Sequence, residues 1–294
     1  MLLNVTEYYR PETIEDALHL LGRPGIKTTP LAGGTLLVGR RDDDLQAVVD
    51  LRALGLNTIS EQDGQVHLGA MVTLQALVDA PLIHGMAGGI LAQAAKSSAA
   101  RLIRNAATIG GTLAAGPAAN ADLAVALAAL GAQAQLVGET RRLVPAQAVF
   151  EERQPAELLT DVIFERPPAE AEGAFLRVAR TPDDVALVHV AAVLLVRGGI
   201  CRHLTVAVGG ADMSPVRLSK AEQLLTGKHI DQEQINAAIA AGLMAYMPPP
   251  DFRASPAYRR EAAEVLARRA LEQCADAARW QQMMGDGASR EPGD

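Results

Sequence analysis

Two segments far apart in the chain place a Gly-Gly-Thr sequence after a short apolar run. The first is Leu31-Ala32-Gly33-Gly34-Thr35-Leu36, and the second is Thr108-Ile109-Gly110-Gly111-Thr112. Paired glycines let the backbone take positive φ and place no Cβ between the backbone and a ligand. Exposed N–H groups in such a turn form an anion site, and flanking hydroxyls can donate to the same oxygens. One such segment is usually an ordinary turn, but the two together predict that both converge on one diphosphate.

The chain is long enough for about two domains, since it has 294 residues. A stretch rich in Pro, Glu and Gly at 167–173 predicts the boundary between them. The net charge of −7, without a basic stripe, argues against nonspecific nucleic-acid binding. No apolar run approaches the ~20 residues that cross a bilayer, and the N-terminus lacks the pattern of a signal peptide. We therefore expect a cytoplasmic protein with no membrane span and no nucleic-acid partner.

The cysteines and histidines predict no metal site in this chain. Only Cys201 and Cys274 are present, whereas an iron–sulfur cluster needs about four thiolates. The six histidines show no zinc-type spacing. Any redox chemistry here would therefore require an organic cofactor or a partner chain.

Apolar strand patterns alternate with helical patterns along the chain. A strand at 27–31 is expected to lead into the first glycine segment, and Asp63-Gly64 predicts a hairpin turn. Residues 103–122 are expected to form a long loop around the second glycine segment. A buried helix at 122–130 should follow, with Asp122 as its cap. Three more helices are expected at 219–226, 231–244 and 258–273. The mixture predicts the α+β class.

Several further pieces of sequence form a recognisable series. In the first 170 residues these are Ala32-Gly33-Gly34-Thr35, Val49-Asp50-Leu51, Leu68-Gly69-Ala70 with Thr73, and Ile103-Arg104-Asn105 followed by Thr108-Ile109-Gly110-Gly111. They resemble the FAD-binding domain of the medium subunits of molybdenum hydroxylases, such as CO dehydrogenase, xanthine dehydrogenase and nicotine dehydrogenase. The rest resembles that family's flavoprotein C-terminal domain in Ala207-Val208-Gly209-Gly210, Ser214-Pro215-Val216-Arg217, Ala221-Glu222, Asp251-Phe252-Arg253-Ala254-Ser255 and Tyr258-Arg259. Nearly the whole chain is covered, in the family's order.

The resemblance implies a domain plan and a cofactor site. Residues 1–170 would form a PCMH-type FAD-binding domain of two subdomains, with a break near 55 and FAD in the cleft between them. Residues 171–280 would form the C-terminal domain, and 281–294 a disordered tail. The implied FAD contacts are Ala32, Gly33, Gly34, Thr35 and Leu36 in the first segment, Thr108, Ile109, Gly110, Gly111 and Thr112 in the second, and Asp122, Leu158 and Leu159 further on. No catalytic proton-transfer residue is implied.

The chain departs from the family's pattern after the second glycine segment. The family usually has Asn or Ser where Thr112 stands, and threonine keeps a hydroxyl. Pro117 comes one residue early and Asp122 one residue late, so Asn120 or Ala121 is the alternative occupant of the aspartate's place. Where some relatives carry a lysine after the position of Phe175, this chain has Leu176, and Arg177 would be a partial substitute.

By the same resemblance, the chain would be the electron-transfer subunit of a heterotrimer. A large subunit with a molybdopterin cofactor would hydroxylate a substrate, and a small subunit with two [2Fe–2S] clusters would pass electrons to FAD in this chain and then to an external acceptor. The complex would be a dimer of heterotrimers. One alternative is a self-sufficient flavoprotein oxidoreductase, which would need its own base near the flavin. Another is a docking subunit that has lost flavin, which the altered spacing before Asp122 would explain.

Overall fold

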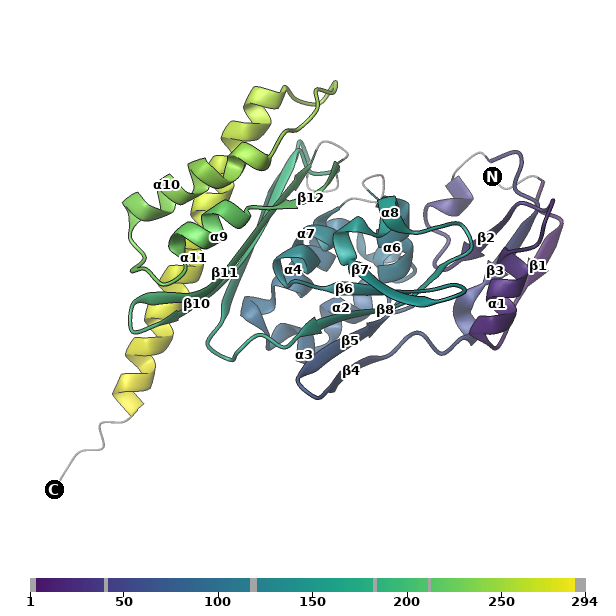
Figure 1. The fold of residues 1–294 in the computed structure, drawn as a ribbon, viewed down its shortest axis with the longest axis horizontal. Coiled ribbons are helices and arrows are strands. Elements are labelled where there is room, and N and C mark those ends of the chain that lie inside the picture. The colour runs from purple at the N-terminus through teal and green to yellow at the C-terminus, as the bar shows by residue number, and fades with distance from the viewer. Residues whose placement is uncertain (1–3, 40–41, 117–120, 182–183, 211–212, 289–294) are drawn as a thin grey trace.

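The computed structural model describes residues 4–39, 42–116, 121–181, 184–210 and 213–288. Three sheets follow one another along the molecule, each with its own helices (Figure 1). Among the described residues, no helix is both long and apolar enough to cross a bilayer.

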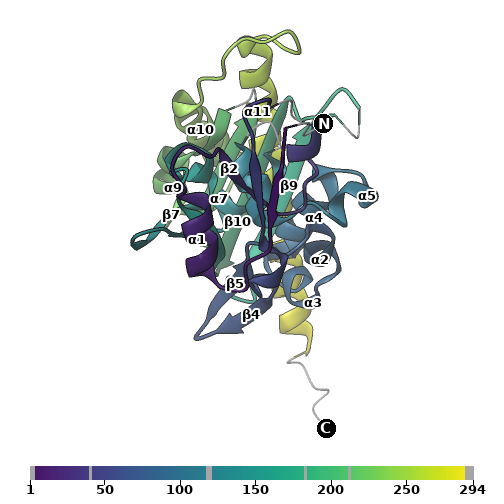
Figure 2. The ribbon, with the colours of Figure 1, turned by 90° about the vertical axis from the view of Figure 1, so that its right-hand side faces the viewer.

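The first sheet is small and parallel. Its strands are β1 (Glu7–Tyr9), β2 (Thr28–Leu31) and β3 (Ala47–Asp50), in the order β1-β3-β2. Helix α1 (Ile14–Leu21) connects β1 to β2, and Figure 2 shows it in front of the C-terminal helices. The hydroxyl of Thr13 accepts a hydrogen bond from the Asp16 amide and so caps this helix. Strand β2 ends at Leu31, as expected, and delivers the chain directly into the first glycine segment.

The second sheet is antiparallel, with strand order β4-β5-β8-β6-β7. Its strands are β4 (Ile59–Gln62), β5 (Gln65–Gly69), β6 (Gln133–Val137), β7 (Arg141–Pro145) and β8 (Leu158–Glu165). The expected hairpin at Asp63-Gly64 is confirmed, because Gln62 pairs with Gln65 and both turn residues have positive φ. Its helices are α2 (Leu74–Asp79), α3 (Pro81–His84), α4 (Ile90–Ser98), α5 (Arg101–Arg104), α6 (Ile109–Ala115), α7 (Asp122–Ala129) and α8 (Val149–Glu152).

The third sheet, β12-β11-β10-β9, is antiparallel and carries its own helices on the face away from α7 (Figure 1). Its strands are β9 (Glu172–Val178), β10 (Val188–Arg197), β11 (Ile200–Gly210) and β12 (Met213–Arg217). The three expected helices are confirmed as α9 (Ser219–Leu225), α10 (Gln232–Gly242) and α11 (Pro256–Ala288). Helix α11 continues past residue 280, where the sequence predicted a disordered tail, so that prediction is wrong for 281–288; residues 289–294 lie outside the described part.

Helix α7 joins the second and third sheets. All eight of its residues are buried, and it packs on β10 and β11. Both of its ends are tied to the third sheet: Asp122 bonds to His189 of β10, and the Ala129 carbonyl accepts a hydrogen bond from Thr205 of β11. Consequently, one apolar core includes residues of both sheets, such as Leu68 of β5 and Val193 of β10.

The structure corrects the expected loop at 103–122. The second glycine segment opens helix α6, with Thr108 as N-cap, instead of forming a turn. Gly110 and Gly111 have helical backbone angles, and of the four paired glycines only Gly34 has a positive φ, of 69°. The reason for the glycines is close packing: a Cβ on Gly110 would lie 2.9 Å from the Ala70 carbonyl oxygen.

Candidate cofactor site

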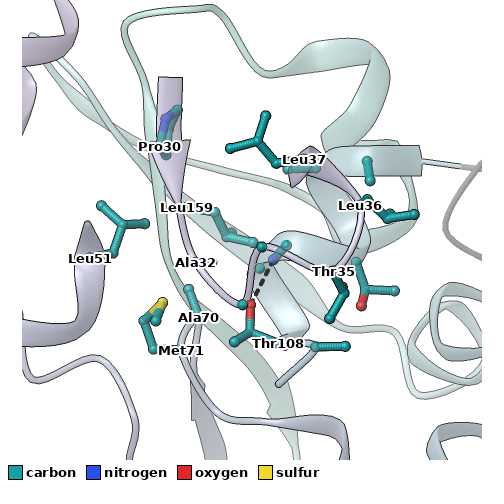
Figure 3. A pocket seen from close by; sticks show the side chains of 18 of the residues that line it. Pro30, Ala32, Thr35, Leu36, Leu37, Leu51, Ala70, Met71, Thr108 and Leu159 are labelled. Atoms are coloured by element: carbon teal, nitrogen blue, oxygen red, sulfur yellow. Dashed lines mark hydrogen bonds between the residues drawn. The ribbon is translucent and has the colours of Figure 1, made fainter. Parts of the chain in front are cut away.

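A cavity of about 370 Å³ lies where the first two sheets meet. Its size is within the range of small-molecule and cofactor sites. Figure 3 shows Ala32 and Thr35 of the first glycine segment and Thr108 of the second around the same space. Of the residues implied by the resemblance, those that line the cavity are Ala32, Gly33, Gly34, Thr35, Leu36, Thr108, Gly110, Gly111, Thr112, Leu158 and Leu159. The two segments therefore share one crevice.

The first glycine segment leaves its backbone donors available. Within the described residues, the amides of Gly33, Gly34 and Thr35 donate no hydrogen bond. Gly34 takes the left-handed conformation, which turns the chain sharply. Consecutive N–H groups around such a turn form a concave anion site. These amides, with the Thr35 hydroxyl beside them, are suited to phosphate oxygens.

The second segment has no free amides at the same positions. Ile109 donates to the Val72 carbonyl at 2.9 Å, Gly110 to the Ala70 carbonyl at 2.8 Å, and Gly111 to the Thr108 hydroxyl at 3.1 Å. The dashed line in Figure 3 marks the bond that Thr108 accepts. The expectation that both segments present backbone amides is therefore wrong for the second one. What it contributes to the cavity is a wall without side chains at Gly110 and Gly111, together with two hydroxyls.

Two of the implied contacts lie away from the cavity. Ile109 is completely buried in the core of the second sheet. Asp122 is also completely buried, in the first turn of α7, and its carboxylate lies 2.7 Å from Nδ1 of His189 and 3.5 Å from Nη1 of Arg177. It is not the cap expected from the sequence, because Ala121 occupies the N-cap position. Its partners hold β9 and β10 against α7.

Ala121 and Asn120 were the alternatives to Asp122 for the position of the family's aspartate. Ala121 is buried and does not line the cavity, and Asn120 lies outside the described residues. Arg177 is turned toward Asp122 and donates to the Ser97 carbonyl at 2.8 Å, so it does not line the cavity either.

The loop between α8 and β8 supplies the charges on the cavity wall. Among the described lining residues, only Arg153 and Glu157 are charged. Hydrogen bonds from Arg142 at 2.7 and 2.8 Å keep the pKa of Glu157 below its ordinary value. Burial lowers the pKa of Arg153, which nevertheless stays protonated because an arginine pKa is so high. Sequence patterns gave no sign of this pair, since neither residue belongs to a repeated or recognisable motif.

Most of the chain matches known protein domains. Residues 4–166 match the model described as the FAD binding domain in molybdopterin dehydrogenase, which is more than half of the chain. The chain belongs to this family. Residues 173–274 match the CO dehydrogenase flavoprotein C-terminal domain. The resemblance seen in the sequence is thereby confirmed, and the chain is part of an oxidoreductase.

Relatives of this family match over most of their length. The carbon monoxide dehydrogenase medium chain of Afipia carboxidovorans is 32% identical over 276 residues, which cover 90% of this chain and 95% of the relative. The nicotine 6-hydroxylase medium subunit of Paenarthrobacter nicotinovorans is 31% identical, with 92% and 98% covered. Among solved structures, a crystal structure of Cu,Mo-CO dehydrogenase matches with a TM-score of 0.87 at 31% identity, covering 94% of this chain and 100% of that one.

The residues present at the cavity fit the family's FAD. Free amides at Gly33 to Thr35 match an anionic diphosphate, and a Cβ on Gly111 would lie 3.0 Å from the Thr108 hydroxyl oxygen and crowd the wall. Apolar side chains such as Met71, Leu74 and Leu159 offer contact surface for aromatic rings. The site therefore combines an anion-binding end with an apolar wall.

Proposed function

We propose that this chain is the FAD-carrying electron-transfer subunit of a heterotrimeric molybdenum hydroxylase. Electrons would come from [2Fe–2S] clusters of a partner subunit and leave to an external acceptor. The observation that supports this most is the convergence of the two glycine segments on one cavity inside the matched FAD-binding domain. Bound FAD supplies a centre that can take electrons singly and release them as a pair.

In this proposal the residues of the cavity bind and orient, and none transfers a proton. The amides of Gly33, Gly34 and Thr35 would hold the diphosphate. The hydroxyls of Thr108 and Thr112, with Gly110 and Gly111, would form the opposing wall. Leu36, Leu158 and Leu159 would exclude water from the rest of the cofactor. Ala32 would form the cavity wall just before the first pair of glycines.

The implied partners are a large molybdopterin-containing subunit and a small iron–sulfur subunit, assembled as a dimer of heterotrimers in the cytoplasm. The support is family membership together with the names of the relatives, which are medium chains or medium subunits. A chain that carries only the flavin needs both partners to complete the reaction.

The cavity gives little support to a self-sufficient flavoprotein. Such an enzyme would need a base beside the flavin, and among the described residues no histidine lines the cavity. Glu157 is the one carboxylate among the described lining residues, and the two bonds from Arg142 hold it ionised and fixed. A docking subunit without flavin is also disfavoured, because the anion-binding turn and the cavity are both intact.

Two measurements test the proposal. The purified chain should bind FAD in a one-to-one ratio, measured as flavin released on denaturation. Co-expression with the genes next to it should yield a stable three-chain complex that contains molybdenum and iron. A colourless chain that takes up no FAD would contradict the cofactor assignment, and a chain that binds FAD but never associates with such partners would favour the self-sufficient enzyme.

A further inference from the structure

Among the described residues that line the cavity, one cation has unused hydrogen-bond donors. Nη1 of Arg153 donates to the carbonyls of Gln154 and Glu157, both at 3.0 Å. Its Nε and Nη2 donate no hydrogen bond to the described residues, and neither is sealed from the surface. Because Arg153 lines the cavity, these two donors are available to a ligand there.

Arg153 and the first glycine segment line the same cavity and are linked through one apolar cluster. The carbonyl that anchors it belongs to Glu157, which is followed by Leu158. Leu158 packs in the same apolar cluster as Leu51 and Met71, and Ala32 packs against that cluster. Ala32 leads directly into Gly33 and Gly34, whose amides are free.

The hydrogen bonds of Glu157 also leave Arg153 available to an anion. Both carboxylate oxygens of Glu157 accept hydrogen bonds from Arg142, at 2.7 and 2.8 Å, and not from Arg153. Neither glycine segment contains a lysine or arginine. A diphosphate held there by amides alone would lack a counter-charge, which Arg153 can provide.

We propose that Arg153 binds the diphosphate of FAD through Nε and Nη2, as a pair of parallel charge-assisted hydrogen bonds. An arginine offers this fork to phosphate oxygens, while lysine offers only a point charge. The proposal rests on the proposed function, because it requires FAD in this cavity. It assigns to Arg153 a binding role that neither glycine segment can fill.

The test measures affinity of the full chain, stripped of flavin, for FAD, ADP and riboflavin. Arg153→Gln should weaken the binding of FAD and of ADP by the same factor, about tenfold or more, because both ligands carry the diphosphate. Riboflavin lacks it and should bind equally well to both proteins. The loss of FAD affinity with added salt should be smaller in the variant. The matched control is Arg141→Gln, which removes the same charge from an exposed position on β7.

A second variant covers the case in which Arg153→Gln does not fold. Arg153→Lys keeps the positive charge but not the paired guanidinium donors, and it should weaken FAD binding about threefold. The proposal is overturned if FAD affinity stays within about twofold of the wild type in the variants that fold. It is also overturned if the binding of riboflavin is weakened as much as the binding of FAD, because that result would place Arg153 beside the flavin ring. A wild-type chain that binds no FAD would overturn the proposed function as well, whereas a wild type that binds normally beside an unaffected variant overturns only the role of Arg153.

Discussion

Gly33 lies against the backbone of Ala106, so closely that a Cβ on Gly33 would be 1.8 Å from the Ala106 carbonyl oxygen. The loop before α6 and the first glycine segment therefore touch through their main chains. This contact fixes the distance between the two walls of the cavity. Only glycine is compatible with it, because any side chain at this position would push the walls apart.

Gly33→Ala should therefore lose most of its FAD and also lose stability. Relief of the clash requires a backbone shift, and such overpacking costs about 1–3 kcal/mol. Flavin content after purification and the midpoint of thermal unfolding are the measurements. Gly39→Ala is the matched control, since a Cβ there meets nothing within 4 Å. Normal flavin content in Gly33→Ala would show that the contact with Ala106 does not set the width of the cavity.

Asp122→Ala should reduce stability strongly and change FAD affinity little. The carboxylate is completely buried between His189 and Arg177, and removal of one partner from a buried ion pair costs about 3–5 kcal/mol. Urea unfolding and FAD titration on the same protein measure the two effects. A variant of normal stability that fails to bind FAD would instead support the contact implied by the family resemblance.

Thr108→Ala should destabilise the start of α6. The Thr108 hydroxyl accepts the amide of Gly111 at 3.1 Å, and loss of such a cap costs about 0.5–2 kcal/mol. Thr108→Ser keeps the oxygen and should restore most of the loss, as measured by chemical denaturation. Equal stability of the alanine and serine variants would mean that the cap contributes nothing here.

The contribution of Asp50 to stability should disappear in acid. Burial of this carboxyl opposes its ionisation, but hydrogen bonds from Arg52 and Tyr8 outweigh that effect and lower its pKa from 3.8 to about 2. Because the folded state binds the proton more weakly than the unfolded state, the stabilisation is present above the ordinary pKa and is lost as pH falls toward about 2. The stability difference between wild type and Asp50→Asn should shrink over that range. The exposed Asp43→Asn is the control, and a difference that does not vary with pH would contradict the expectation.

The two cysteines should resist thiol reagents in the folded protein. Burial raises the pKa of Cys201 to about 11 and that of Cys274 to about 12. The reactive thiolate is therefore scarce at about pH 8, and the reagent has no access. Labelling followed by mass spectrometry should show slow modification that becomes rapid in denaturant. Rapid labelling of the native chain would indicate that the third sheet opens locally.

Local sequence signals predicted those elements whose structure is decided locally. Asp63-Gly64 gave the hairpin because both residues accept positive φ, and strand 27–31 was placed correctly ahead of the first glycine segment. The start of α6 was misread because two adjacent glycines usually indicate a turn. Here they allow close approach to Ala70, a contact with a distant residue that no local pattern reveals.

Local sequence patterns were also insufficient at the cofactor site, where contacts between distant residues decide the outcome. The glycine segments could be found from their sequences, but nothing in the sequence showed which amides were already bonded within the fold. Asp122 was implied by the family resemblance despite its altered spacing, and only the position of β10 shows that His189 contacts its carboxylate. Arg153 was missed because its significance depends on the salt bridge between Arg142 and Glu157, which joins strand β7 to the loop before β8.

The burial of α7 on every side has a practical consequence for anyone who wishes to divide this protein. A fragment that ends near the boundary at 167–173 would expose to water an alanine- and leucine-rich helix that β10 and β11 normally cover. Such a fragment should precipitate or form mixed aggregates, even though it contains every lining residue of the cavity except Val185. Studies of cofactor uptake by this protein therefore need the full-length polypeptide.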